Sequence, residues 1–263
     1  TEGSFTLTYE WKAVNQGGII DYRFTAVANP VLKMVDIDGD DDLDVIYGQD
    51  DSNAGMGGAT KLLQFDSKRL VQNTDSKYNF LSNIGSISDI QAGDVNGDGI
   101  PDVWMSLSNG AGARFNVSSG TTSFLESTGL SDYKLYNAKS QILDLNNDGQ
   151  KEIISLGLTN TTSSAKLKLY VLKYSKLDNS LTTIDESTQV TSLTASSFDF
   201  GDYDQDQDID FLISGFSASS GLKSFLYTNE TLPSESLSIK QTSNNLVAVR
   251  DGSTDFIDFD SDG

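Results

Sequence analysis

Acidic side chains recur at alternate positions in a nine-residue stretch of this chain, residues 94–102 (DVNGDGIPD). Its positions 1, 3, 5 and 9 carry side-chain oxygens from Asp94, Asn96, Asp98 and Asp102. Carboxylates held this close repel one another unless a cation lies among them. Because Ca²⁺ takes about six to eight oxygen ligands from carboxylates and carbonyls, the stretch has the chemistry of a Ca²⁺-binding loop.

The same nine-residue frame recurs along the chain. Three further copies are complete: DIDGDDDLD from Asp36, DLNNDGQKE from Asp144 and DYDQDQDID from Asp202. A fifth, incomplete copy (DFDSDG) begins at Asp258. Successive copies start 50 to 58 residues apart, a period that matches one four-stranded blade of a β-propeller.

Short runs of branched and aromatic residues flank each loop and favour strands over helices. We expect a first strand before each loop, at residues 31–35, 87–92, 140–143, 197–200 and 254–257. A second strand follows each complete loop, at residues 45–48, 103–108, 153–157 and 211–215. Third strands are expected at 61–65, 113–117, 167–175 and 223–228, and weaker patterns indicate fourth strands at 188–193 and 237–242. Residues 5–14 and 19–27 predict a hairpin ahead of the first loop.

The residues that follow the acidic stretch indicate which of the known calcium-binding motifs this is. An EF-hand needs a bidentate Glu at position 12 and a helix after it. Position 12 of the four complete loops lies inside an apolar run and is occupied by Tyr47, Met105, Ser155 and Ile213. The EF-hand is therefore excluded, and the loop is expected to join two strands.

A strand-joining loop of this kind is typical of the integrin-α-type propeller repeats, also called FG-GAP or VCBS repeats. The chain resembles them over nearly its whole length, through GDVNGDGIPDV (93–103), LDLNNDGQKEI (143–153) and GDYDQDQDIDFLISG (201–215). The last of these resembles the bacterial, extracellular form. The FG and GAP tripeptides that name the integrin form do not occur as such. The resemblance implies an all-β fold, a β-propeller of four-stranded antiparallel blades with a Ca²⁺-binding loop between the first and second strands of each blade.

The resemblance also implies which residues hold the ions, about one Ca²⁺ per blade, with position 7 contributing its backbone carbonyl. The first loop would use Asp36, Asp38, Asp40, Asp42 and Asp44. The second would use Asp94, Asn96, Asp98, Ile100 and Asp102. The third would use Asp144, Asn146, Asp148, Gln150 and Glu152, and the fourth Asp202, Asp204, Asp206, Asp208 and Asp210. The incomplete fifth loop offers Asp258, Asp260 and Asp262.

The four loops depart from the family pattern to different degrees. Position 6 favours a positive φ, which Gly99 and Gly149 adopt at no steric cost. Asp41 tolerates this backbone moderately and Gln207 less readily. Glu152 at position 9 is one methylene longer than aspartate. We therefore expect the second loop to be the best formed and the third and fourth to be looser.

Composition excludes several function classes. The formal net charge of −20 argues against nucleic acid and anionic membrane as partners. The chain has no cysteine and no histidine, which removes zinc-thiolate sites and histidine-based catalysis. No apolar run is long enough to span a membrane, so membrane insertion is not expected. Calcium loops are filled most easily outside the cell, which favours an extracellular or cell-surface location.

Three other features of the sequence bear on function. Carboxylates outside the loops, such as Glu126, lie in polar segments without a recognisable partner, so we predict no enzymatic activity. Trp104 and the tyrosines could stack on sugars, but at strand spacing such rings more often pack between sheets. Sequons for N-glycosylation occur at Asn116, Asn160 and Asn229, as often as chance predicts in so Asn-, Ser- and Thr-rich a chain.

These observations predict a single propeller domain, or part of one, over residues 1–263. The expected repeats are 1–30 (outer strands of a partial blade), 31–86, 87–138, 139–195, 196–252 and 253–263 (the start of another blade). The leading hypothesis is a calcium-stabilised, non-enzymatic binding, adhesion or assembly module whose loop faces contact protein or glycan. The alternatives are an accessory propeller of a secreted polysaccharide-degrading enzyme and a structural spacer in a larger surface assembly.

Overall fold

The structure is a computed structural model of the chain, and it shows an all-β protein. It describes residues 11–15, 18–22, 30–49, 60–66, 69–73, 75–82, 84–119, 123–128, 130, 133–162, 167–187, 193–217, 221–231, 238–242, 246–248, 254 and 256–257. In these ranges no helix is long and apolar enough to cross a membrane. The helical elements there are two short 3₁₀ turns, η1 (Ser76–Leu81) and η2 (Ser108–Gly110).

The described strands form four four-stranded antiparallel sheets and one two-stranded hairpin. The hairpin comprises β1 (Trp11–Asn15) and β2 (Gly18–Tyr22). The first sheet comprises β3 (Pro30–Val35), β4 (Asp44–Gln49), β5 (Lys61–Asp66) and β6 (Arg69–Gln72). The second comprises β7 (Ile87–Gly93), β8 (Asp102–Leu107), β9 (Ala113–Ser118) and β10 (Phe124–Glu126). The third comprises β11 (Tyr136–Leu143), β12 (Glu152–Leu158), β13 (Leu167–Ser175) and β14 (Ser180–Ser187). The fourth comprises β15 (Thr194–Gly201), β16 (Asp210–Ser217), β17 (Gly221–Asn229) and β18 (Ile239–Gln241).

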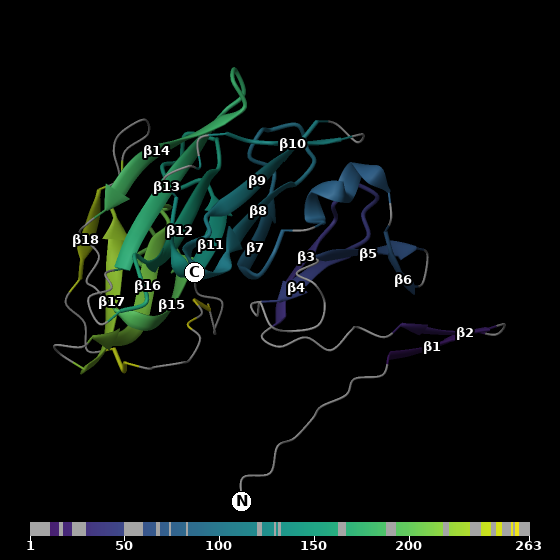
Figure 1. Ribbon diagram of the computed structural model, residues 1–263. Helices are drawn as coiled ribbons and strands as arrows, with labels where there is room; N and C mark the ends of the chain where they lie inside the picture. Colours follow the sequence, from purple (N-terminus) through teal and green to yellow (C-terminus); the bar gives the residue numbers. More distant parts are fainter. Residues whose placement is uncertain are drawn as a thin grey trace, which may run out of the picture.

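Each four-stranded sheet is a meander in which consecutive strands pair, and the sheets follow one another in chain order (Figure 1). A hydrophobic core lies between each sheet and the next. One core joins Ile46 of the first sheet to Met105 of the second, and another joins Trp104 of the second to Ile153 of the third. A third core joins Ile154 of the third sheet to Phe211 of the fourth.

The second strands of the second and third sheets, β8 and β12, are apolar on both faces because a neighbouring sheet covers each face. Successive strand residues point to opposite faces, so Trp104 and Met105 enter different cores. Ile153 and Ile154 divide between two cores in the same way. This explains why these strands appear in the sequence as unbroken apolar runs.

The structure confirms the expected first, second and third strands of the four complete repeats, with changes at their ends. The first strand of the third sheet starts earlier than expected, at Tyr136, and has a bulge near its start. Gly157 on the paired strand leaves room for this bulge, because a Cβ at position 157 would lie 2.9 Å from the Cβ of Leu135. The fourth strand expected at 188–193 was misplaced: β14 covers Ser180–Ser187, and residues 188–192 lie outside the described residues. Weak patterns of this kind fix strand ends poorly because solvent-exposed edge strands carry few apolar residues.

The two ends of the chain are described only in part. Of the hairpin expected from residues 5–14 and 19–27, the structure describes the paired strands β1 and β2, and residues 5–10 and 23–27 lie outside the described residues. Thr254, Phe256 and Ile257 carry no strand assignment, contrary to the expected strand. Phe256 nevertheless lies against β15, where its backbone N–H donates to Asp199 at 2.6 Å.

Candidate metal-binding loops

All four complete acidic loops join the first and second strands of a sheet. They connect β3 to β4, β7 to β8, β11 to β12, and β15 to β16. Position 2 anchors three of the loops in the cores between sheets, because Ile37, Val95 and Leu145 are buried there. In the fourth loop Tyr203 occupies position 2 and is 58% exposed.

The position 1 aspartate organises the backbone of each loop. Asp36 accepts hydrogen bonds from the backbone N–H groups of positions 4, 5 and 6 at 2.7 to 3.1 Å. Asp94 accepts from the same three positions at 2.6 to 3.1 Å. Asp144 accepts from positions 5 and 6, and Asp202 accepts from position 6. The loops therefore share one hydrogen-bonded frame.

This frame requires a left-handed backbone at two positions. Position 6 has φ between 70° and 86° in all four loops, at Asp41, Gly99, Gly149 and Gln207. Gln207 therefore follows the same path as glycine, although the sequence indicated a looser fit. Position 4 is also left-handed, with φ between 53° and 78° at Gly39, Gly97, Asn147 and Gln205. This role of position 4 was not predicted from the sequence, although Gly and Asn are the residues that adopt this conformation most readily.

The position 9 carboxylate is buried in every loop. The exposed fractions are 1% for Asp44, 0% for Asp102, 1% for Glu152 and 0% for Asp210. Each of these carboxylates accepts a hydrogen bond from the backbone N–H of position 2. Position 9 therefore ties the end of the loop back to its start, in addition to any metal that it binds.

Position 5 interacts with position 7 in the same way in all four loops. Its carboxylate accepts the backbone N–H of position 7 at 2.9 to 3.0 Å, which pairs Asp40 with Asp42, Asp98 with Ile100, Asp148 with Gln150, and Asp206 with Asp208.

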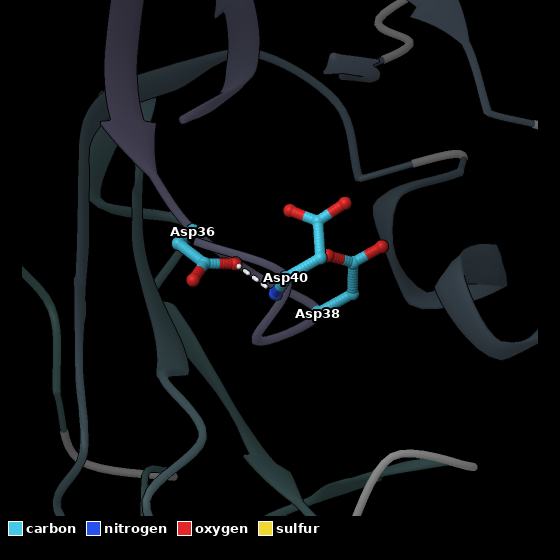
Figure 2. Close-up of side chains that lie close together, drawn as sticks. All are labelled: Asp36, Asp38 and Asp40. Carbon is cyan, nitrogen blue, oxygen red and sulfur yellow. Dashed lines mark hydrogen bonds between the residues drawn. The ribbon is translucent and has the colours of Figure 1, made fainter. Parts of the chain in front are cut away.

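The first loop gathers three carboxylates around one point (Figure 2). Oxygens of Asp36, Asp38 and Asp40 lie within 4.8 Å of one another. Oδ2 of Asp38 accepts a hydrogen bond from Gln64 at 2.6 Å, while its Oδ1 is buried without a partner. Burial and the Asp40 carboxylate raise the pKa of Asp38. A buried, unpartnered carboxylate oxygen beside two others fits a cation-binding site.

The second loop converges on the Ser118 hydroxyl at the end of β9. Ser118 Oγ lies 3.1 Å from both Asp98 oxygens, 3.3 Å from the Ile100 carbonyl and 2.9 Å from Asp102. A hydroxyl has one proton to donate, and backbone N–H groups also donate here, from Ile100 to Asp98 at 2.9 Å and from Ser118 to Asp102 at 2.7 Å. The predicted ligands from positions 5, 7 and 9 thus face one space, and this donor set also fits Ca²⁺.

The third loop differs because a lysine enters it. The Lys173 ammonium, from β13, donates to Asp148 and lies 3.8 Å from Glu152. Burial alone would raise the pKa of Asp148, but the Lys173 ammonium and the Gln150 N–H together lower it. Burial raises the pKa of Glu152 to about 7, although the N–H of Leu145 and the Lys173 ammonium act in the opposite direction.

The fourth loop again brings three carboxylates together. Oxygens of Asp202, Asp204 and Asp210 lie within 4.8 Å of one another. Burial raises the pKa of Asp210 against hydrogen bonds from the backbone N–H groups of Asn229 and Tyr203. This loop also touches the third loop, because Asn147 Nδ2 donates to Asp208 at 2.6 Å.

Other sequence candidates occupy different places. Asp258, Asp260 and Asp262 of the fifth loop lie outside the described residues. Trp104 is fully buried, so it packs between sheets and offers no platform to a sugar. Glu126 forms an exposed ion pair with Arg114 at 3.0 Å. Sequence reasoning missed Ser118 and Lys173, because nothing local indicates which third-strand residue faces a loop.

No family model and no curated protein matches the sequence. Among solved structures, the chain is similar to fructofuranosidase from Schwanniomyces occidentalis complexed with fructose, with 10% identity and a TM-score of 0.38 over 76% of this chain and 43% of that chain. It is also similar to the V. cholerae biofilm matrix protein Bap1, with 12% identity and a TM-score of 0.39 over 84% of this chain and 40% of that chain. The chain spans less than half the length of either structure.

Proposed function

We propose that the chain is a calcium-stabilised β-propeller segment of the FG-GAP/VCBS type, located outside the cell or on its surface, and that it acts as a non-enzymatic binding module. The observation that carries the proposal is one loop geometry repeated four times, each time between the first and second strands of a four-stranded antiparallel sheet. Repetition at this spacing favours a built ion site over an ordinary acidic turn.

The first, second and fourth loops supply the Ca²⁺ sites in this proposal. Their donor sets are hard oxygens from carboxylates and a backbone carbonyl, which are the ligands that Ca²⁺ prefers. The bound ion neutralises carboxylates that would otherwise repel one another and joins the first strand to the second. Its main role is therefore to stabilise each sheet, and it need not touch a partner.

A hollow on the loop side is the partner surface that we assign. It has a volume of about 790 Å³ and lies between the second loop, the third loop and the turn that joins β13 to β14. Lys151 and Lys176 line it and are exposed. Neither ammonium forms an ion pair with any residue that the structure describes. Leu177 at the tip of the turn is fully exposed.

The chemistry of this hollow favours a polysaccharide that carries carboxylate or sulfate groups. The two lysines that line this hollow attract anions, whereas the rest of a chain with a net charge of −20 repels them. A partner of this class would therefore be directed to this surface. The absence of histidine and cysteine from the sequence supports a binding role over a catalytic one.

Thermal unfolding of metal-stripped protein with and without Ca²⁺ tests the metal assignment. One site filled at about 100 times its Kd adds about 2.7 kcal/mol, which raises the Tm of a protein of this size by roughly 5–10 °C. Asp98→Asn should remove one bound Ca²⁺, while Glu126→Gln, at an exposed ion pair, serves as the matched control. An unchanged melt in excess chelator, with no Ca²⁺ detected by calorimetric titration, would refute the proposal.

A further inference from the structure

Lys173 lies where the third loop would hold its ion. It sits on the third strand of its own sheet, β13, and its ammonium donates to the position 5 carboxylate of Asp148. The same ammonium lies 3.8 Å from Oε1 of the position 9 residue, Glu152. This Glu152 oxygen is buried and accepts no hydrogen bond, so the ammonium is the charge that faces it.

Strand register shows that this arrangement is specific to the third sheet. Position 10 of each loop pairs with a residue of the third strand: Val45 with Leu63, Val103 with Asn116, Ile153 with Leu172, and Phe211 with Tyr227. The next residue along the third strand is therefore equivalent in all four sheets, and these residues are Gln64, Val117, Lys173 and Thr228. Lys173 alone among them carries a positive charge.

The other equivalent residues cannot supply a cation. Gln64 also reaches its loop, where its amide donates to Asp38 at 2.6 Å, but it is neutral. The Val117 side chain has no polar atom, and its neighbour Ser118 donates only its hydroxyl and its backbone N–H to the second loop, both of them neutral. The first and second loops therefore retain an excess of negative charge.

The number of carboxylates does not explain the difference between the loops. The second and third loops have the same charges at positions 1, 3, 5 and 9: an aspartate, an asparagine, an aspartate and a final acid. They also share a backbone path, with φ of 71° and 86° at Gly97 and Gly99 and of 53° and 84° at Asn147 and Gly149. What separates them is the side chain that enters from the third strand.

We propose that the Lys173 ammonium replaces the divalent cation in the third loop, so that this loop binds no Ca²⁺ while the first, second and fourth do. Ca²⁺ needs ligand oxygens at about 2.3–2.6 Å, and an ion at that distance from Asp148 and Glu152 would lie against the ammonium. The two cations repel each other, and a lysine tethered to β13 is present at every Ca²⁺ concentration. This inference rests on the proposed function for its contrast among the loops.

Calcium stoichiometry tests the inference, measured by titration calorimetry on the metal-stripped, full chain. Asp98→Asn in the second loop should bind one Ca²⁺ fewer than the wild type. Asp148→Asn, the equivalent change in the third loop, should bind the same number as the wild type. Lys173→Met, which keeps the length of the side chain and removes its charge, should bind one Ca²⁺ more.

The outcomes separate the inference from the proposed function. If Asp148→Asn loses one Ca²⁺, as Asp98→Asn does, the third loop is an ordinary metal site and the inference is wrong. The inference is also wrong if folded Lys173→Met gains no ion. Should Lys173→Met fail to fold, the comparison of the two aspartate variants decides alone. A wild-type chain that binds no Ca²⁺ overturns the proposed function, and the contrast among loops falls with it.

Discussion

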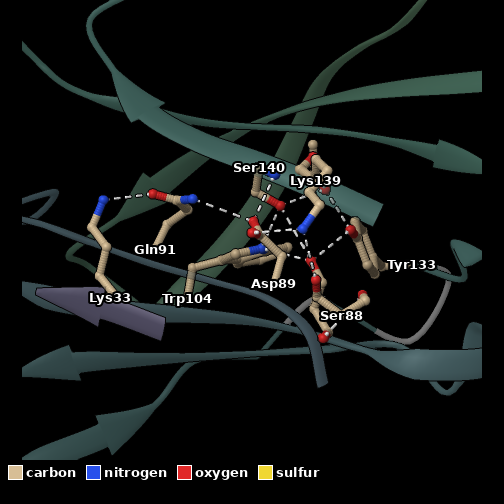
Figure 3. A network of polar contacts seen from close by, with 10 residues as sticks. Lys33, Ser88, Asp89, Gln91, Trp104, Tyr133, Lys139 and Ser140 are labelled. Atoms are coloured by element: carbon tan, nitrogen blue, oxygen red, sulfur yellow. Dashed lines mark hydrogen bonds and ion pairs between the residues drawn. The ribbon is translucent and has the colours of Figure 1, made fainter. Parts of the chain in front are cut away.

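Asp89→Asn should remove a pH dependence of folding stability that arises from one buried carboxyl group. Asp89 lies on β7, is 6% exposed, and accepts the backbone N–H of Ser140 on β11 at 2.7 Å (Figure 3). The Lys139 ammonium is 3.8 Å away, and Gln91 links the group to Lys33. Burial raises the pKa of Asp89 from 3.8 to about 6, against the opposing effects of Lys139 and the Ser140 N–H.

The sign and size of the effect follow from this pKa. A carboxyl group whose pKa is higher in the folded state binds its proton more tightly there, so protonation stabilises the fold. The contribution is fully present below about pH 4 and is lost as the pH rises through about 6. The rise of the Asp89 pKa from 3.8 to about 6 corresponds to about 3 kcal/mol. Asparagine keeps an oxygen for the Ser140 N–H and cannot ionise. The folding stability of the Asp89→Asn protein therefore lacks this pH dependence.

Urea unfolding of both proteins at saturating Ca²⁺, from pH 3.5 to pH 7.5, measures the effect. The stability of Asp89→Asn relative to the wild type should rise by about 3 kcal/mol across this range. The other carboxylates titrate in both proteins, so the difference between them cancels those contributions. If the Asp89→Asn difference does not change with pH, burial does not control this group and the reasoning fails.

Two further predictions concern the surface. Charge reversal at Lys151 and Lys176 together should abolish binding of dextran sulfate, with uncharged dextran as the control; unchanged affinity would exclude the hollow as the anion site. In a host cell that N-glycosylates secreted proteins, Asn160 should be the sequon that is modified, because Asn116 and Asn229 are only 2% and 0% exposed. Asn160 lies in an exposed turn, where Thr162 Oγ1 donates to its side chain at 2.6 Å. A glycan mass that survives Asn160→Gln would contradict this assignment.

The sequence predicted the repeats and most strands because their signals are local. Apolar runs such as 103–108 and 153–157 appear wherever two neighbouring sheets bury both faces of a strand. The loops could also be predicted from the sequence, since the acidic frame needs particular residues at fixed spacing. Where the pattern weakened, as at the fourth strand of the third sheet, the prediction failed, because an edge strand needs few apolar residues.

The features that sequence reasoning missed depend on the pairing of distant strands. Lys173 is 25 residues from Asp148, and only the register between β12 and β13 brings them together. Nothing near Asp89 in the sequence indicates its burial, because its partner Ser140 is 51 residues away on the next sheet. Such contacts decide charge and pKa, and no local pattern reports them.

The loops hold their shape through hydrogen bonds from their own backbone N–H groups. Positions 1 and 9 bond to backbone N–H groups of the loop itself, and position 9 is buried in every copy. Position 5 also accepts the backbone N–H of position 7, whereas Oδ1 of the position 3 residue Asp38 is buried without a partner. The proposed replacement of a metal by Lys173 in the third loop requires a backbone path that is the same with either cation. The left-handed φ values shared by the second and third loops are what such an exchange requires.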